Sequence, residues 1–150
     1  MALVLYDTNI LIDALKGYEQ ALQELAYWDE PAISAVTWME VYAGATPDEV
    51  PRLDELIANV GFEVIHTDRD IMKLAAEIRG DSIRKGPKVG LPDAIIMATA
   101  LHLKLQIITR NKKDFKGSNV RFPYELVTNT TVQVVNTIPP GKERDTTQKR

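Results

Sequence analysis

Short apolar runs rich in branched side chains alternate along this chain with longer segments that have a helical period. The runs at 2–6, 31–36, 62–66 and 105–109 have the length of strands, and the segments between them repeat apolar residues every three or four positions. Such alternation predicts a parallel sheet with helices on both faces, joined by right-handed crossovers. We therefore predict a three-layer α/β/α fold whose sheet has four to five strands. Residues 124–128 are the candidate for a fifth strand.

Helices are expected between these strands. The predicted helices cover residues 10–28, 37–45, 48–60, 68–85 and 91–104. The last of these is apolar nearly all round, which predicts a helix enclosed by the rest of the molecule.

A chain of 150 residues suits one folded domain. We place that domain at residues 1–127 and treat residues 128–150 as a C-terminal extension. Residues 130–138 alternate enough to form an added edge strand, and residues 139–150 have the composition of flexible chain. No segment is apolar enough to span a membrane, and no basic residue precedes the first apolar run as in a signal peptide, so a cytoplasmic location is expected.

Residue types that are scarce exclude several kinds of chemistry. The chain has no cysteine and two histidines, which excludes a thiol nucleophile, a thiolate zinc site and a multi-histidine metal site. The net charge of −3 is unfavourable for a general binder of phosphate backbones, unless metal ions offset the acids at one site. Any catalysis must therefore depend mainly on carboxylates.

Four acidic residues occupy positions that a structural role alone would explain. Asp7 follows the first strand, where a lone Asp usually serves as a turn or N-cap residue. Thr37 and Glu40 match a capping box, and Asp93 in a first helical turn is favoured by the helix dipole. Asp114, within "TRNKKDF", is by itself typical of a solvated loop. Each acid taken singly is compatible with these roles.

The joint placement of the four acids favours a shared site. Asp7, Glu40 and Asp114 each follow the carboxyl end of a predicted strand. Asp93 begins the helix that leads into the fourth strand. Functional sites in parallel sheets form at the edge where the carboxyl ends of the strands lie. Two carboxylates about 4 Å apart repel by roughly 4 kcal/mol at an effective dielectric of ~20, so a cluster needs a cation unless some acids hold protons. Oxygen ligands of this kind suit Mg²⁺ or Mn²⁺.

Four motifs occur in an order typical of one known family. These motifs are "DTN" from Asp7, "TWMEVYAG" around Glu40, "DAIIMATAL" from Asp93 and "TRNKKDF" from Thr109. Together they resemble the PIN domain, and most closely the VapC-type toxin ribonucleases of toxin–antitoxin pairs. The resemblance runs from about residue 2 to residue 127. A departure is Lys104, which stands in a turn where such proteins often have Gly.

The resemblance implies a divalent-metal-dependent endoribonuclease that hydrolyses RNA phosphodiester bonds. It assigns the catalytic and metal-binding roles to Asp7, Glu40, Asp93 and Asp114. The polar residues that match those around the acids are Thr8, Asn9, Thr109 and Asn111. The implied partners are an RNA substrate, a small antitoxin protein and a second copy of the chain in a homodimer.

Basic and aromatic residues supply further candidates for binding. Two basic clusters flank the acids and could contact RNA phosphates, or could form an ordinary solvated face. Their members are Arg79, Arg84, Lys85 and Lys88 before Asp93, and Arg110, Lys112, Lys113 and Lys116 around Asp114. Arg84, Lys85, Arg110 and Lys112 are the candidates that we select. Trp28, Trp38 and Tyr42 could line an antitoxin groove or could pack in the core.

Other functions stay open at this stage. A PIN-like nuclease that is not a toxin, or a non-catalytic PIN-like module that binds RNA or protein, would share these motifs. A receiver domain would need a second acid beside Asp7, and a haloacid-dehalogenase-like phosphatase would need Asp at Asn9. Both of these fit the sequence less well.

Overall fold

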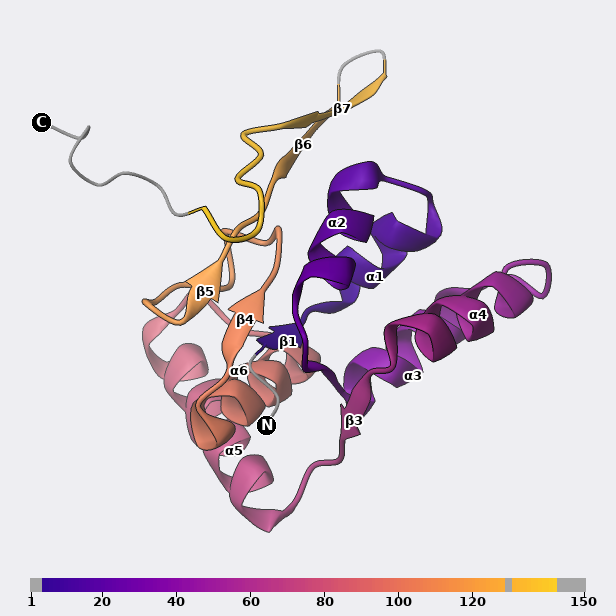
Figure 1. Ribbon diagram of the computed structural model, residues 1–150. Coiled ribbons are helices and arrows are strands. Elements are labelled where there is room, and N and C mark those ends of the chain that lie inside the picture. Colours follow the sequence, from indigo (N-terminus) through magenta and orange to yellow (C-terminus); the bar gives the residue numbers. More distant parts are fainter. Residues whose placement is uncertain (1–3, 129–130, 143–150) are drawn as a thin grey trace, which may run out of the picture.

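The computed structural model describes residues 4–128 and 131–142. Five parallel strands form a sheet in the order β3-β2-β1-β4-β5 (Figure 1). The strands are β1 (Val4–Tyr6), β2 (Pro31–Ser34), β3 (Glu63–Ile65), β4 (Gln106–Ile108) and β5 (Val120–Arg121). The predicted α/β fold with a parallel sheet is confirmed.

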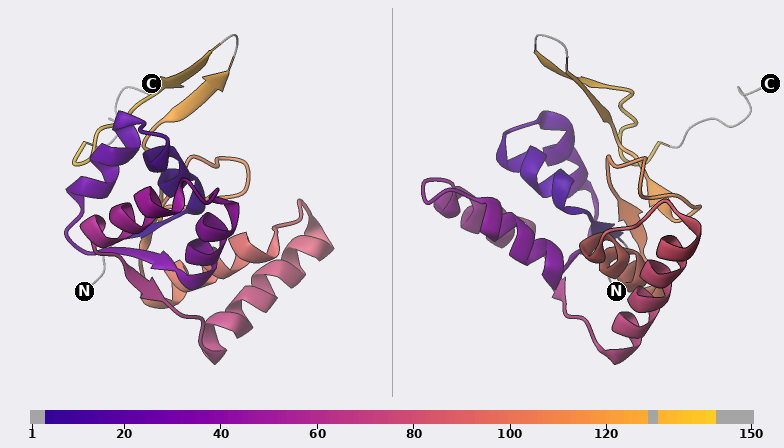
Figure 2. Two further views of the ribbon diagram at one scale, coloured as in Figure 1. Left: turned by 90° about the vertical axis from the view of Figure 1, so that its right-hand side faces the viewer. Right: turned by 180° about the vertical axis from the view of Figure 1, so that it is seen from behind.

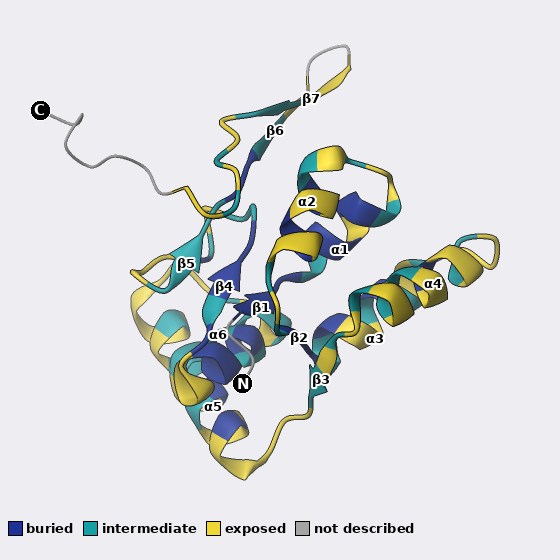
Figure 3. Cartoon of the chain, viewed as in Figure 1, coloured by how far each residue is buried: buried dark blue, intermediate teal, exposed yellow. Residues whose placement is uncertain are grey.

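Helices cover both faces of this sheet. They are α1 (Thr8–Leu15), α2 (Glu19–Tyr27), α3 (Ala35–Gly44), α4 (Val50–Val60), α5 (Arg69–Lys85) and α6 (Leu91–Leu103). Successive strand residues point to opposite faces. Tyr6 and Ile108 pack with residues of α1, α2 and α4, whereas Leu5 and Ile107 pack with residues of α6. Helix α5 packs against α6 on the outside (Figure 3). The central strands are therefore buried on both faces, which explains their continuous apolar sequences.

The predicted helix at 10–28 is wrong in one respect, because the structure divides it into α1 and α2. The division falls at Lys16 and Gly17, and Gly17 has a φ of 86°, a left-handed conformation that favours glycine.

The prediction that residues 124–128 supply the fifth strand of the main sheet is also wrong. Strand β5 takes that place, and β6 (Glu125–Thr128) pairs in antiparallel fashion with β7 (Val132–Val135) in a separate two-stranded sheet. This hairpin projects from the body of the molecule (Figure 2). The strand predicted within 130–138 thus exists as β7, but it pairs with β6 and does not join the parallel sheet.

The C-terminal segment returns to the body after the hairpin. The backbone N–H of Ile138 donates to the carbonyl of Pro123, and the Arg121 guanidinium donates to the carbonyl of Ile138. Of the predicted flexible tail, residues 139–142 are described, whereas residues 143–150 lie outside the described residues. Within 4–128 and 131–142, no helix is long and apolar enough to cross a membrane.

Helix α6 carries the chain into β4 and is less enclosed than its sequence predicts. Ile96 and Ala100 are fully buried on its inner side, but Leu91 and Leu101 are 64% and 53% exposed. The sheet and α5 cover only part of its circumference. The helix ends at Lys104, which has a φ of 56°, so a lysine occupies the left-handed position where Gly is usual.

Candidate active site

Asp7 lies at the carboxyl end of the central strand β1 and is 4% exposed. Its backbone N–H donates to the carbonyl of Ile108, which extends the pairing with β4. One carboxylate oxygen accepts the N–H of Thr8 at 2.8 Å, as an N-cap of α1. The other accepts the Thr109 hydroxyl at 2.7 Å and the Asn9 amide at 3.1 Å. Asp7 is therefore held by neutral donors from the residues that follow both β1 and β4. We call this edge of the sheet, where the carboxyl ends of the strands meet, the rim.

Glu40 reaches the same rim from α3. Its Oε1 accepts the hydroxyl of Thr8 at 3.0 Å, and that hydroxyl also lies 3.3 Å from the hydroxyl of Thr37. The capping-box role that Thr37 and Glu40 suggested is not the one observed, because Ser34 is the N-cap of α3 and bonds Val36. Glu40 is thus one helical turn too far along the helix for capping, and it faces Asp7's neighbour instead.

Asp114 lies in the loop that follows β4. Its carboxylate accepts the Asn111 amide at 2.9 Å, and its backbone N–H donates to the Asn111 side-chain oxygen at 3.2 Å. The Asn111 N–H in turn donates to the Thr109 hydroxyl at 3.0 Å. Thr109 therefore connects the loop that carries Asp114 to the strand end that carries Asp7.

Asp93 lies in the first turn of α6, just after Pro92. Burial raises the pKa of Asp93 to about 6, and the neighbouring charges of Asp7, Asp114 and Glu40 act in the same direction. Burial also raises the pKa of Asp7, against the hydrogen bonds from Thr109 and Thr8 that lower it. Asp93 therefore lies within electrostatic range of the other three acids. The structure thus brings together the four acids that the sequence selected.

A family comparison agrees with this geometry. The model of the PIN domain matches residues 4–117, which is most of the chain and includes all four acids. The chain belongs to the PIN domain family. This confirms the resemblance that the four motifs indicated.

Similar proteins include both curated and solved members of the family. The tRNA(fMet)-specific endonuclease VapC of Shigella flexneri is 29% identical over 116 residues, which are 73% of this chain and 87% of that protein. A chain in the toxin-antitoxin complex from Klebsiella pneumoniae is 40% identical, with a TM-score of 0.69, and the match covers 81% of this chain and 98% of that one. DNA-bound VapBC from Salmonella typhimurium is 25% identical, with a TM-score of 0.69, over 81% of this chain and 96% of that one.

The donors of this PIN domain suit a divalent ion that keeps some of its waters better than an ion that is bound by protein ligands alone. Within the part of the chain that the structure describes, no three acidic or histidine side chains lie close enough to hold a metal ion by themselves. Mg²⁺ commonly keeps several waters and binds through one or two carboxylates, so a looser cluster of acids suits it. The donors here are carboxylate oxygens supported by hydroxyl and amide groups, with no soft ligand.

A second polar network beside the four acids was not predicted from the sequence. Asp13 of α1 is fully buried and accepts two bonds from Arg110, at 2.6 and 3.1 Å, and one from the Tyr124 hydroxyl at 2.6 Å. The signal was an acid within the apolar stripe of a buried helix, since such a charge must find a partner. The Arg110 backbone N–H also donates to the Asn9 side-chain oxygen. This network therefore fixes both Arg110 and the start of the loop that carries Asp114.

The selected basic residues differ in how free they are. Arg110 is paired with Asp13, and Lys112 is paired with Glu125 and lies 5.7 Å from the ring centre of Phe122. Arg84 pairs with Asp81 on the exposed surface of α5, and Lys85 follows it at the end of that helix. Two of these residues thus lie on α5 and two in the loop after β4, and their contact with RNA stays a prediction.

Proposed function

We propose that this PIN domain is a divalent-metal-dependent endoribonuclease that uses Mg²⁺ or Mn²⁺, and that it is the toxin of a VapBC-type pair. The observation that carries the proposal is the shared rim of Asp7, Glu40, Asp93 and Asp114, where the charges of the other three acids act on Asp93 and the Thr8 hydroxyl joins Glu40 to the neighbour of Asp7. Support comes from the curated relative, whose name is that of a tRNA-specific endonuclease. Further support comes from structural relatives that are parts of toxin-antitoxin complexes.

The four acids divide the work by position. Asp7 and Asp93 would hold the metal, because Asp7 is rigidly oriented and, within the described residues, the charges that act on Asp93 are those of the other acids. When bound, a divalent ion lowers the pKa of water and offsets the negative charge of a phosphate group. Glu40 and Asp114 would orient water at the rim, and Glu40 could accept a proton from the attacking water.

The neutral residues around the acids set their orientation. Thr109 donates to Asp7 while accepting from Asn9 and from the backbone of Asn111, so its hydroxyl hydrogen has one direction available. Supporting bonds of this kind tune metal ligands in many proteins. Together they keep the lone pairs of Asp7 directed toward the rim.

The antitoxin partner is a second part of the proposal. Trp38 and Tyr42 lie on α3 with ring centres 4.6 Å apart, and Trp38 is 43% exposed, so this pair can contact an apolar peptide. Trp28 is placed differently. It donates to Glu24 and packs edge-on against Tyr27, so we assign it to packing at the end of α2. Homodimer formation stays a prediction.

Cleavage by an Asp7→Asn variant tests the central part of the proposal. Asn caps a helix as well as Asp does, so the fold should remain. Cleavage of purified tRNA and rRNA with Mg²⁺ should fall by about 10³-fold, as expected when a charged catalytic group is removed. Chelation of the wild type should have the same effect, and Asp70→Asn, an exposed acid on α5, should change nothing.

Full activity of Asp7→Asn at equal metal would contradict the assignment. Expression in a host without antitoxin tests the toxin part, since growth should stop with the wild type and continue with Asp7→Asn. Normal growth with an active wild-type nuclease would leave a PIN nuclease that is not a toxin.

A further inference from the structure

A hollow of about 220 Å³ lies beside the acidic rim and has an unusual lining. It is lined by Pro87, Val89, Met97, Lys113, Asp114 and Lys116. One wall is thus apolar, another carries two lysines, and the edge is formed by one of the four acids. Met97 is one helical turn beyond Asp93 on α6, so the same side of the helix faces both the rim and the hollow.

The apolar wall is rigidly built. The segment between α5 and α6 is fixed by two bonds to α5: Arg79 donates to the carbonyl of Val89 at 2.6 Å, and the N–H of Val89 donates to the Ser82 hydroxyl at 3.0 Å. The Val89 side chain packs with the α5–α6 cluster. The hollow therefore exists before any ligand arrives.

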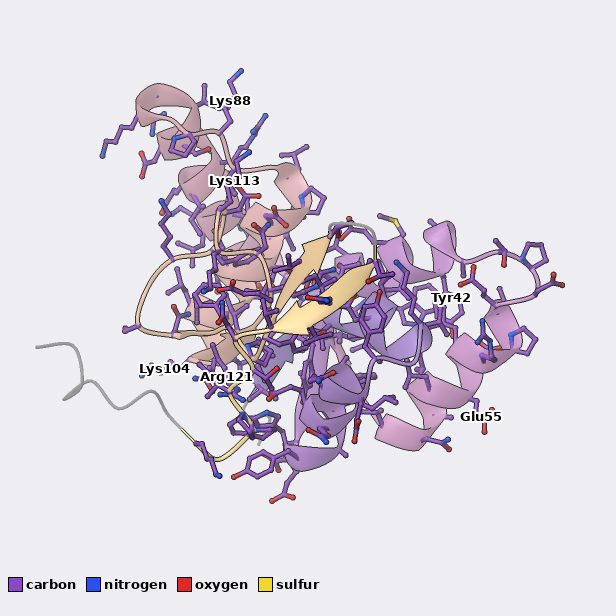
Figure 4. The ribbon with its side chains drawn as sticks, turned by 90° about the horizontal axis from the view of Figure 1, so that it is seen from above. Tyr42, Glu55, Lys88, Lys104, Lys113 and Arg121 are labelled. Atoms are coloured by element: carbon purple, nitrogen blue, oxygen red, sulfur yellow. The ribbon has the colours of Figure 1, made fainter. Side chains whose placement is uncertain are left out.

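The two lysines of the hollow differ from their neighbours in the same loop. Arg110 is bonded to Asp13 and Lys112 to Glu125, whereas Lys113 and Lys116 have no ion-pair partner among residues 4–128 and 131–142. Both are exposed. Figure 4 shows Lys113 in the same part of the molecule as Lys88. Pro87 and Val89, which flank Lys88 in sequence, line the hollow together with Lys113. Free positive charge is thus concentrated here.

We propose that this hollow binds one unpaired nucleotide of the RNA next to the phosphodiester that is cut, which rests on the function proposed above. The base lies against Pro87, Val89 and Met97, and Lys113 and Lys116 contact its phosphate. The charge supports this occupant, because an acidic rim repels phosphates and a neighbouring pair of cations must hold the backbone. The size supports it too, since the hollow is smaller than the ~300 Å³ at which pockets for drug-sized ligands begin, and so suits one base.

This placement has a consequence for the choice of substrate. A base can enter such a hollow only when it is unpaired and turned away from its neighbours, as in RNA loops and single strands. The sequence assigned RNA contact to Arg110 and Lys112, whereas the proposed site gives that role within the same loop to Lys113 and Lys116.

The first test is binding of a short, labelled, unstructured RNA with Ca²⁺ in place of Mg²⁺ to slow cleavage. The double variant K113A/K116A should bind about tenfold more weakly. The magnitude of the slope of log affinity against log salt should fall by about 0.7, because the one phosphate that the two lysines contact contributes ~0.7 to the slope. Lys73→Ala, which removes an exposed lysine on α5, should leave both values unchanged.

The second test fills the apolar side of the hollow. Val89→Trp keeps both backbone bonds and both lysines, and should weaken binding several-fold while the salt slope stays at the wild-type value. An RNA with one abasic position beside the cleavage site should bind the wild type several-fold more weakly, but should bind Val89→Trp no more weakly than intact RNA does. The exposed lysine variants keep the test decisive if Val89→Trp does not fold.

The outcomes separate this site from the proposed function. If the wild type cleaves RNA while K113A/K116A matches Lys73→Ala, the nucleotide site is wrong and the nuclease stands. If the wild type neither binds nor cleaves RNA, both are wrong. An equal effect of the abasic position on wild type and Val89→Trp would place the base elsewhere.

Discussion

Two groups of acids in this molecule have different partners. Asp13 and Glu24 are buried, and each is bonded to an arginine of the chain: Asp13 to Arg110, and Glu24 to Arg121 at 2.5 Å. The acids of the rim receive hydrogen bonds only from threonine, asparagine and backbone groups within the described residues. Within the described residues, the first group is thus ion-paired with arginines, whereas the second is hydrogen-bonded to neutral donors.

This difference indicates which acids stabilise the fold and which are available to bind a cation from solution. The charge of a buried acid that is paired with an arginine is already balanced, so that acid needs no metal ion. Asp93 has a raised pKa because it is partly buried and its charged neighbours are acids. We infer that the rim is unfavourable to the metal-free fold and favourable to metal binding.

The largest expected effect is on stability at Asp13. Asp13→Ala leaves Arg110 and the buried Tyr124 hydroxyl without their partner, which should lower the free energy of unfolding by about 3–5 kcal/mol. Asp7→Asn, which removes a charge from the rim, should leave metal-free stability equal or higher. Denaturant unfolding of both variants measures this, and equal losses would remove the distinction between the two groups.

A smaller effect is expected from the support of Asp7. Thr109→Val keeps the shape of a buried residue but removes the hydroxyl that donates to Asp7 at 2.7 Å. Removal of such a supporting bond should weaken metal binding by about 10–100-fold. Calorimetric titration with Mn²⁺ measures it. Thr99→Val, which removes a buried hydroxyl that bonds within α6, is the matched control and should bind Mn²⁺ as the wild type does.

The pH dependence of stability should reveal the charge at Asp93. Its pKa is about 6 in the fold against an ordinary 3.8, so between these pH values the native state binds more protons than the unfolded state. Stability of the metal-free protein should therefore fall as pH rises from about 4 to 6, by about 1 kcal/mol after allowance for solvent screening of a half-buried group. Thermal unfolding across this range should show the decrease for the wild type, less of it for Asp93→Asn, and none with saturating Mg²⁺. A rise through this window for the wild type and Asp93→Asn alike would contradict the account.

The smallest effect is expected where both charges are in solvent. Arg84 and Asp81 form a pair on α5 with side chains that are 66% and 59% exposed. Asp81→Ala should change the free energy of unfolding by less than about 0.5 kcal/mol. A decrease as large as that of Asp13→Ala would show that burial is not what separates these pairs.

Much of this architecture follows from local sequence patterns. The 3.6-residue period predicted a helix at 68–85, and α5 covers Arg69–Lys85. The four acids were found because each stands beside a strand end or helix start that the pattern also marks. Local reasoning was wrong where a glycine ended a helix early, at Gly17, and where a two-residue strand, β5, was too short to leave a periodic signal.

The contacts that hold the site together could not be predicted in this way. Thr109 bonds Asp7 across 102 positions, and Tyr124 bonds Asp13 across 111. Such partners depend on the order of strands in the sheet, which places β4 beside β1. The free lysines of the hollow were equally hidden, since the sequence does not show that Arg110 and Lys112 are already paired.

Calorimetric titration of the protein with Mg²⁺ or Mn²⁺ tests the central claim most directly, that the rim acids form no ion pair within the described residues and accept a cation from solution. The wild type and Asp70→Asn should bind the ion equally, and Asp7→Asn and Asp93→Asn should each bind it at least about tenfold more weakly. Equal binding by all four proteins would show that the ion binds elsewhere, and that the four acids are not a metal site.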